Sequence, residues 1–201
     1  VFDLGGVLVR IHRSPQDALR AVGFVSEAPV EFSDPIAYAH LNQRYQSGLV
    51  PLTDFIDSTR ELLSAEVPAE VLLAAHDQIL IEQYQGALEV VTRLQNTGVQ
   101  TCVLSNTCAR HWVHLERFSA VEQALKGGCF LSFELGLVKP SPAIYECVQS
   151  RLGLAPERIG FVDDSVENVQ SARAMGWRAV EVPYERNDSI ALEAALGMLG
   201  F

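Results

Sequence analysis

Apolar runs and helical repeats alternate along the chain from about Gly86 onward. Leu88, Val91 and Leu94 recur at helical spacing and predict a helix that ends at 96–98. Further apolar runs predict buried strands over 99–104, 129–133, 159–162 and 178–182. The remaining periodic segments predict a helix after Ser105 and helices over 142–152, 166–175 and 190–199. This alternation is typical of an α/β fold, in which a parallel sheet is covered by helices on both faces. We therefore expect a three-layer, Rossmann-like core.

The first residues predict one more strand. The short apolar run from Val1 to Leu4 carries Asp3 and leads into the pair Gly5-Gly6. A strand of about four residues is near the lower end of the usual range. Because the chain also opens with Val rather than Met, we suspect that upstream residues are missing from this numbering.

Residues 14–83 have a different pattern. Helical periodicity is punctuated by prolines, and no convincing strand is predicted. We therefore predict a helical cap over 14–83, inserted into a core made of 1–13 and 84–201. Since the insertion directly follows the Asp3 turn, it could lie over the carboxyl ends of the strands, where open α/β sheets bind ligands.

Composition and charge narrow the class of protein. Among the 201 residues, 48% are hydrophobic and 20% charged, which is ordinary for a soluble globular enzyme. No apolar run is long enough for a membrane helix and none marks a signal peptide, so we expect a cytoplasmic protein without a membrane partner. A net charge of −10 with scattered basic residues argues against binding to nucleic acid. The oligomeric state is not predicted.

The four cysteines are predicted to be reduced thiols. Their spacing contains no C-x-x-C pair, and the sequence has no secretory context. A zinc site would need closer pairing of cysteines. The four residues are Cys102, Cys108, Cys129 and Cys147.

Polar groups follow apolar runs or precede helices at four separated places. They supply a carboxylate, a hydroxyl, a cation and an acidic pair, which are the parts of a phosphoryl-transfer site. Two adjacent carboxylates repel each other unless a cation or solvent intervenes, and Mg²⁺ is a hard, oxygen-loving ion usually shared with substrate phosphate. The groups are Asp3, Ser105-Asn106-Thr107, Lys139, and Asp163-Asp164.

Each of these groups also has a local structural explanation. Asp3 could form a turn, Ser105 could cap the next helix, and Lys139 could be a surface residue before a helix. The acidic pair could be a solvated turn and helix cap. Four such coincidences together are harder to explain as turns, and capping and phosphate binding can use the same free N–H groups.

These stretches resemble the four motifs of the haloacid dehalogenase superfamily, over nearly the whole chain. Further residues, including His111 and Tyr145, resemble most the branch that contains bacterial glucose-1-phosphate phosphatase. The four matching stretches are Phe2-Asp3-Leu4-Gly5-Gly6-Val7, Leu104-Ser105-Asn106, Lys139-Pro140 and Val162-Asp163-Asp164-Ser165.

The resemblance implies a Mg²⁺-dependent phosphatase that acts on a small phosphorylated metabolite, such as a sugar phosphate. Asp3 would attack phosphorus and form an aspartyl-phosphate, which water then hydrolyses. The resemblance also implies two sets of residues. Mg²⁺ would be held by Asp3, the Gly5 carbonyl, Asp163 and Asp164. The phosphoryl group and the rest of the substrate would be bound by Ser105, Asn106, Lys139 and His111, with Lys139 also counted as catalytic, while Asn168 would support the acidic loop.

One position departs from the family pattern. Active phosphatases of the family commonly have a second aspartate two residues after the nucleophile, and this chain has Gly5 there. Such acid–base help contributes about two to four powers of ten in rate, so its loss favours leaving groups that need little protonation. His12 or His111 could replace the acid, although an isolated histidine is more often structural.

Two other functions remain open. A haloacid dehalogenase also uses a nucleophilic aspartate and needs no metal, although the acidic pair would repel its carboxylate substrate. A catalytically idle relative could bind a phosphorylated ligand or a protein partner. Four residues within or just before the predicted cap could read the leaving group: His12, Arg13, Arg44 and Tyr45.

Overall fold

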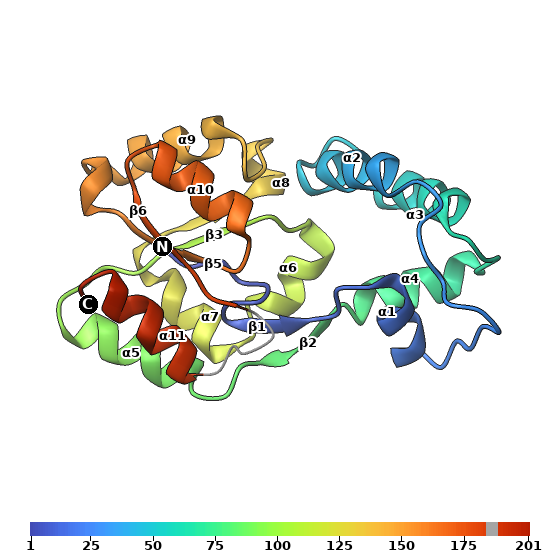
Figure 1. The fold of residues 1–201 in the computed structure, drawn as a ribbon, viewed down its shortest axis with the longest axis horizontal. Coiled ribbons are helices and arrows are strands. Elements are labelled where there is room, and N and C mark those ends of the chain that lie inside the picture. Colours follow the sequence, from blue (N-terminus) through green and yellow to red (C-terminus); the bar gives the residue numbers. More distant parts are fainter. Residues whose placement is uncertain (184–188) are drawn as a thin grey trace.

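The computed structural model describes residues 1–183 and 189–201, and a parallel sheet lies at its centre (Figure 1). In this sheet β3 pairs with β4, and β5 pairs with β6. Phe2 forms parallel bridges with both Val103 and Val162, so residues 1–3 join the two halves in the order β4, β3, residues 1–3, β5, β6. The strands are β3 (Val103–Ser105), β4 (Cys129–Leu131), β5 (Gly160–Asp163) and β6 (Arg178–Glu181).

Helices cover both faces of this sheet, which confirms the predicted three-layer α/β fold (Figure 1). Helices α5, α7 and α11 contribute Val91, Val121 and Leu192 to one apolar cluster, whereas α9 and α10 contribute Ile144 and Val169 to another. The helices are α5 (Ala87–Asn96), α7 (Ser119–Ala124), α9 (Pro142–Leu152), α10 (Val166–Ala174) and α11 (Ser189–Met198). Shorter elements are α6 (Ala109–Leu115), α8 (Ser132–Leu135) and the 3₁₀ turns η1 (Leu125–Gly127) and η2 (Pro156–Arg158).

The segment between residues 14 and 79 folds into four helices that pack on one another. Ser14 and Asp34 cap the first two helices by accepting hydrogen bonds from backbone N–H groups of the first turn, and a proline occupies the first turn of each. In their apolar cluster the rings of Tyr45 and Phe55 stack with centroids 4.0 Å apart. The helices are α1 (Pro15–Ala21), α2 (Pro35–Gln46), α3 (Leu52–Leu62) and α4 (Ala69–Asp77).

A two-stranded antiparallel ribbon connects these helices to the sheet-bearing core (Figure 1). It consists of β1 (Val9–Ile11) and β2 (Leu80–Gln83), with Val9 opposite Gln83. The expectation that residues 14–83 contain no strand is therefore wrong for β2. Its partner lies about seventy residues earlier in the sequence, so a local pattern could not reveal the pairing.

Predicted strands also differ from the structure at their ends. The predicted strand 99–104 forms a ladder only over Val103–Ser105, and before it the Thr101 carbonyl accepts from the Gly127 N–H of η1. The predicted strand 129–133 ends at Leu131, and Ser132 begins α8. Over the part of the chain that the structure describes, no helix is both long and apolar enough to cross a membrane.

Candidate active site

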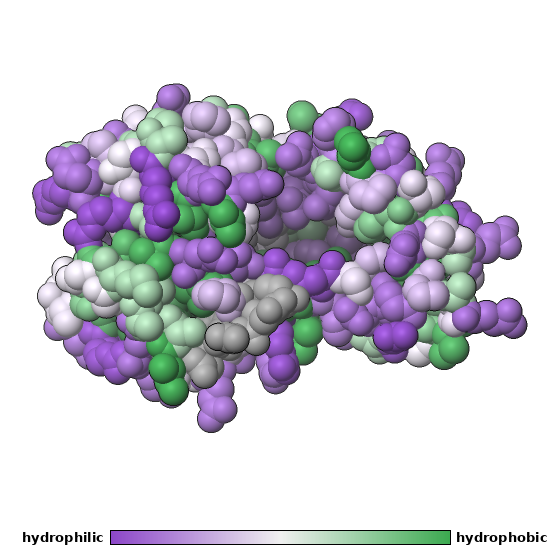
Figure 2. Space-filling view, in the orientation of Figure 1, coloured by the Kyte–Doolittle hydropathy of each residue, from purple (hydrophilic) through white to green (hydrophobic). Residues whose placement is uncertain are grey.

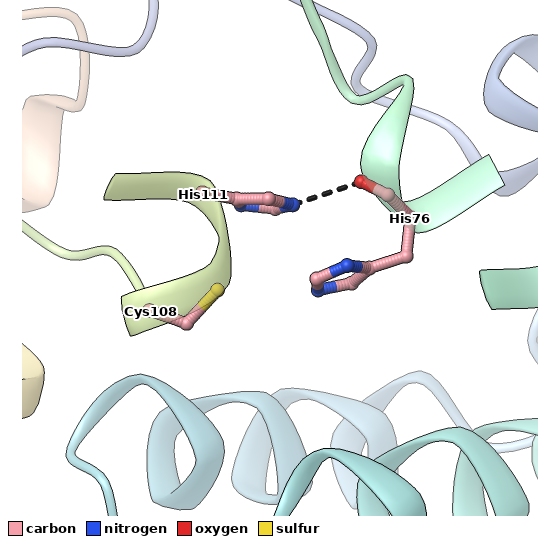
Figure 3. Close-up of side chains that lie close together, drawn as sticks. All are labelled: His76, Cys108 and His111. Atoms are coloured by element: carbon pink, nitrogen blue, oxygen red, sulfur yellow. Dashed lines mark hydrogen bonds between the residues drawn. The ribbon is translucent and has the colours of Figure 1, made fainter. Parts of the chain in front are cut away.

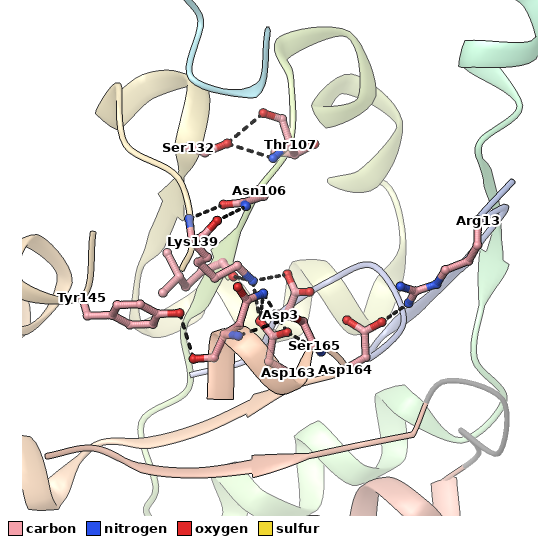
Figure 4. A network of polar contacts seen from close by, with 12 residues as sticks. Asp3, Arg13, Asn106, Thr107, Ser132, Lys139, Tyr145, Asp163, Asp164 and Ser165 are labelled. Carbon is pink, nitrogen blue, oxygen red and sulfur yellow. Dashed lines mark hydrogen bonds and ion pairs between the residues drawn. The ribbon is translucent and has the colours of Figure 1, made fainter. Parts of the chain in front are cut away.

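Lys139 lies between two carboxylates at the carboxyl edge of the sheet (Figure 4). Its Nζ is 2.8 Å from Asp3 Oδ1 and 2.6 Å from Asp163 Oδ2, and it donates a third bond to the Leu104 carbonyl at 3.1 Å. All three charged side chains are buried, with Asp163 fully inaccessible to solvent. Asp3 and Asp163 come from neighbouring positions of the sheet because Phe2 pairs with Val162. The predicted convergence of the first aspartate, the lysine and the acidic pair is thus present.

Burial and the neighbouring charges shift the pKa values of Asp3 and Lys139 in opposite directions. Burial raises the pKa of Asp3 to about 6, although the Lys139 ammonium opposes that shift. Burial alone would lower the pKa of Lys139, but the carboxylates of Asp163 and Asp3 raise it above its usual value. Lys139 therefore stays charged at neutral pH and offsets part of the negative charge of its two acidic partners.

Asp163 is held in place by several donors. Its Oδ1 accepts hydrogen bonds from the Ser165 N–H at 2.8 Å and from the Asn168 side-chain amide at 2.9 Å. The Tyr145 hydroxyl in turn donates to the Asn168 carbonyl at 3.0 Å. Because Asn168 lies on the first turn of α10, whose N-cap is Ser165, the helix start fixes the orientation of the carboxylate.

The Asn106 side chain clamps the backbone of Lys139. Its Nδ2 donates to the Lys139 carbonyl at 2.9 Å, and its Oδ1 accepts from the Lys139 N–H at 2.8 Å. On the same loop, the Thr107 N–H donates to the buried Ser132 hydroxyl at 2.9 Å. These bonds position both the lysine and the loop that follows Ser105.

A cavity of about 310 Å³ opens beside these residues, between the core and the helices α2, α3 and α4. Figure 2 shows a hollow between the two parts of the molecule. From the core, the cavity is lined by Gly5, Ser105, Asn106 and His111, and from the helices by residues that include Asn42, Tyr45 and Gln46.

The acidic groups fit a hard divalent cation. One carboxylate oxygen from each of Asp3, Asp163 and Asp164 lies within 4.8 Å of the others. Carboxylate oxygens are the ligands that Mg²⁺ prefers in proteins. Two cationic side chains lie beside these three acidic groups. Lys139 contacts Asp3, and Arg13 forms an ion pair with Asp164 (Figure 4). The balance of formal charge is therefore negative, and a divalent cation would offset it.

The other candidate residues lie in different places. His12, Arg13 and Tyr45 line the cavity, whereas Arg44 is exposed and is not among its lining residues. His111 is on the cavity wall, but its Nε2 lies 2.8 Å from the His76 carbonyl oxygen rather than near Asp3.

Several contacts join residues that are far apart in the sequence. The Arg13–Asp164 ion pair joins the end of the ribbon to the acidic loop across 151 positions. The side chains of His76, Cys108 and His111 come together from α4 and the start of α6. The i, i+3 spacing of Cys108 and His111 was a visible signal, but nothing local pointed to His76.

Comparisons with known proteins identify the family of the chain. The model of a haloacid dehalogenase-like hydrolase matches residues 1–176. The chain belongs to this family, as its motifs predicted. A mouse protein, acyl-CoA dehydrogenase family member 10, is 26% identical over 98% of the chain, but the chain spans only 19% of that protein.

Other relatives have comparable length. The chain is 25% identical to D-ribitol-5-phosphate phosphatase of Bacteroides thetaiotaomicron, covering 90% of this chain and 89% of that protein. It is 23% identical to (S)-2-haloacid dehalogenase 4A of Burkholderia cepacia, over 93% and 83% of the two chains. In structure it resembles a family enzyme of Bacteroides thetaiotaomicron in complex with magnesium and inorganic phosphate, with a TM-score of 0.71, 23% identity, and coverage of 92% and 94%. At that identity the likeness shows the fold.

Proposed function

We propose that the protein is a Mg²⁺-dependent phosphatase that hydrolyses a small phosphorylated metabolite with Asp3 as nucleophile. The observation that carries this proposal is the buried Lys139 between Asp3 and Asp163, with the Asp164 carboxylate in the same cluster. A charge-paired carboxylate at a strand end, beside a cavity and next to candidate metal ligands, suits attack on a phosphoryl group.

In the first step, an Asp3 carboxylate oxygen forms a bond to phosphorus while the bond to the leaving oxygen breaks. The leaving group departs as an alcohol or an acid once it has gained a proton, and Asp3 carries the phosphoryl group as a mixed anhydride. In the second step, water attacks phosphorus, which releases inorganic phosphate and regenerates the Asp3 carboxylate. Lys139 fixes the orientation of Asp3 through the 2.8 Å contact.

Other residues would bind the phosphoryl oxygens and the cation. The Ser105 hydroxyl, the Asn106 backbone N–H and Lys139 would contact the oxygens, because the Asn106 side chain is engaged with the Lys139 backbone. Asp3, Asp163, Asp164 and the Gly5 carbonyl would hold Mg²⁺, which when bound supplies positive charge that offsets the charge of the phosphoryl group.

We also propose that residues 14–83 act as a cap over a core made of 1–13 and 84–201. The cavity lies between the two, and Asn42, Tyr45 and Gln46 face the Ser105 loop from the cap side. Residues of the cap would therefore contact the leaving group, while His111 would contact it from the core side.

The leaving group is proposed to be one that needs little protonation, such as an anomeric sugar phosphate or an acyl phosphate. At Gly5, where relatives carry the acid, a Cβ would lie 3.1 Å from Ile11 Cδ1, so an aliphatic side chain occupies that direction. His12 lines the cavity and is our candidate for the acid, because the Nε2 of His111, which also lines the cavity, already lies 2.8 Å from the His76 carbonyl oxygen. The relative named for ribitol 5-phosphate supports a polyol or sugar phosphate as the substrate class.

Haloacid dehalogenase is the second candidate, because one relative has that activity and Gly5 removes the expected phosphatase acid. The negative charge of Asp163 and Asp164 opposes a carboxylate substrate in the absence of a cation. Release of chloride from 2-chloropropionate in the presence of chelator would favour this candidate.

The direct test is hydrolysis of para-nitrophenyl phosphate and of a panel of sugar and acyl phosphates, with Mg²⁺ or with excess chelator. We expect turnover with Mg²⁺ and its loss in Asp3→Asn. Asp17→Asn, which changes an exposed carboxylate in α1, is the matched control and should keep activity. Full activity in chelator, or in Asp3→Asn, would refute the proposal. Failure on every ester, together with thermal stabilisation by phosphorylated ligands, would instead indicate a binding protein.

A further inference from the structure

Three potential metal ligands meet outside the Asp3 cluster. Cys108 and His111 lie one helical turn apart at the start of α6, and His76 projects from α4 (Figure 3). One ligand atom of each residue lies within 4.8 Å of the other two. Cys108 and His76 are buried, with exposed fractions of 4% and 6%. The proposed phosphatase chemistry uses neither of them.

A hydrogen bond to a backbone carbonyl determines which ring nitrogen of His111 carries the hydrogen. The His111 Nε2 lies 2.8 Å from the carbonyl oxygen of His76, so this nitrogen donates its hydrogen there (Figure 3). In the neutral ring Nδ1 then carries the free lone pair. Histidines that bind metals commonly donate their second ring N–H to a carbonyl in this way.

His76 has a buried ring nitrogen without a partner. Among the described residues, its Nδ1 is the one buried side-chain nitrogen or oxygen for which no hydrogen-bond partner is present. The Asp77 carboxylate oxygen is 3.8 Å away, which is too far for a hydrogen bond. An unsatisfied buried polar atom is costly, so the interior of the protein alone does not satisfy the polar groups of the His76 ring.

The sulfur of Cys108 is the third potential ligand atom of this cluster. The thiolate, rather than the thiol, is the ligand for metals.

We propose that His76, Cys108 and His111 form a binding site for a thiophilic divalent transition metal such as Zn²⁺. One sulfur and two imidazole nitrogens are a typical ligand set for Zn²⁺, whereas Mg²⁺ prefers oxygen ligands. All three residues line the same cavity as Ser105, so the open fourth coordination position would face that cavity.

Binding requires a small movement of side chains. The imidazole rings of His76 and His111 are stacked, with centroids 4.2 Å apart and planes at 24°. The edges of a tetrahedral zinc site with these ligands measure about 3.4 to 3.7 Å, and the three atoms lie within 4.8 Å of one another, so an ion would draw any pair together by at most about 1.4 Å. Rotation of the rings out of the stack would direct both nitrogens toward the metal.

Cobalt provides the test, because a thiolate bound to Co²⁺ gives a charge-transfer absorption in the near ultraviolet. When Co²⁺ is added to metal-free protein in excess Mg²⁺, we expect this band to appear and to saturate at a single Co²⁺ ion per chain. Addition of Zn²⁺ should then remove the band. Cys108→Ser should abolish the band. His76→Ala and His111→Ala should each weaken Co²⁺ binding by about tenfold or more, since loss of groups that merely orient ligands already costs that much.

Two controls separate this site from other groups. Cys129→Ala removes a thiol outside the cluster, and Asp164→Asn weakens the proposed Mg²⁺ site; both should keep the band. Circular dichroism checks that each variant is folded. The absence of a band in folded wild-type protein would overturn the proposal, and so would its persistence in folded Cys108→Ser.

Discussion

Replacement of Lys139 by Met tests the electrostatic balance of the site. Met has a similar length, so the packing around the side chain changes little, but the cation shared by Asp3 and Asp163 is lost. Removing one partner of a buried ion pair costs about 3 to 5 kcal/mol, because the other charge stays buried without compensation. Here two buried carboxylates lose the same partner at 2.8 and 2.6 Å, so we expect a loss of about 5 kcal/mol in the free energy of unfolding.

Urea denaturation followed by circular dichroism measures this loss. Lys126→Met is the matched control, because Lys126 is the chain's other lysine and is exposed; its replacement should change the free energy by less than about 0.5 kcal/mol. Mg²⁺ should restore part of the stability of Lys139→Met, since a bound cation takes over the compensation of charge. Asp163→Asn combined with Lys139→Met should recover stability, because it removes one of the two uncompensated carboxylates. The reasoning would be refuted if Lys139→Met were as stable as Lys126→Met, or if the double variant recovered no stability.

Three further outcomes follow from the structure. Gly6→Ala should weaken Mg²⁺ binding and lower the unfolding free energy by about 1 kcal/mol or more. The φ of Gly6 is +81°, and a Cβ at this position would collide with the Asp164 carboxylate. An unchanged effect of Mg²⁺ on the melting temperature would contradict this prediction. Ser132→Ala should cost about 1 to 3 kcal/mol in urea denaturation by leaving the buried Thr107 N–H unpaired, whereas a loss below 0.5 kcal/mol would show that this bond is replaceable. Burial and the nearby Glu134 carboxylate raise the pKa of the Cys129 thiol to about 12. Alkylation of Cys129 at pH 8 should therefore be much slower than in unfolded protein, and it should accelerate only as the pH approaches that pKa. Peptide mass spectrometry measures the extent of alkylation.

Much of the architecture could be predicted from the sequence because its signals are local. The helix 142–152 has the predicted bounds, since Pro142 marks its first turn and Gly153 follows its end in the left-handed conformation. The convergence of Asp3 and Asp163 could also be predicted, because the carboxyl ends of parallel strands meet at one edge of the sheet. Lys139 lies between α8 and α9 rather than at a strand end, so only the motif resemblance pointed to its place beside them. The four cysteines are free thiols, as their spacing indicated.

Other features depend on partners that are distant in sequence. The strand β2 exists because β1 pairs with it, and the segment 80–83 has no alternation strong enough to predict a strand alone. The ion pair of Arg13 with Asp164 and the placement of His76 beside Cys108 likewise arise only when the helices fold back on the core. Strand ends at Val103 and Leu131 are set by where the ladder stops, which apolar runs do not encode.

The ribbon makes the helical segment modular. Val9 stands opposite Gln83 and Ile11 opposite Leu80, and the His12 N–H bonds to the Ile79 carbonyl at 2.9 Å, so the entry and exit of the segment leave the core side by side. Although the segment contains more than sixty residues, it joins the core at two neighbouring positions, as a hairpin loop would. A shorter or longer helical segment could therefore join the core at the same two points without any change in the order of the strands that carry Asp3 and Asp163.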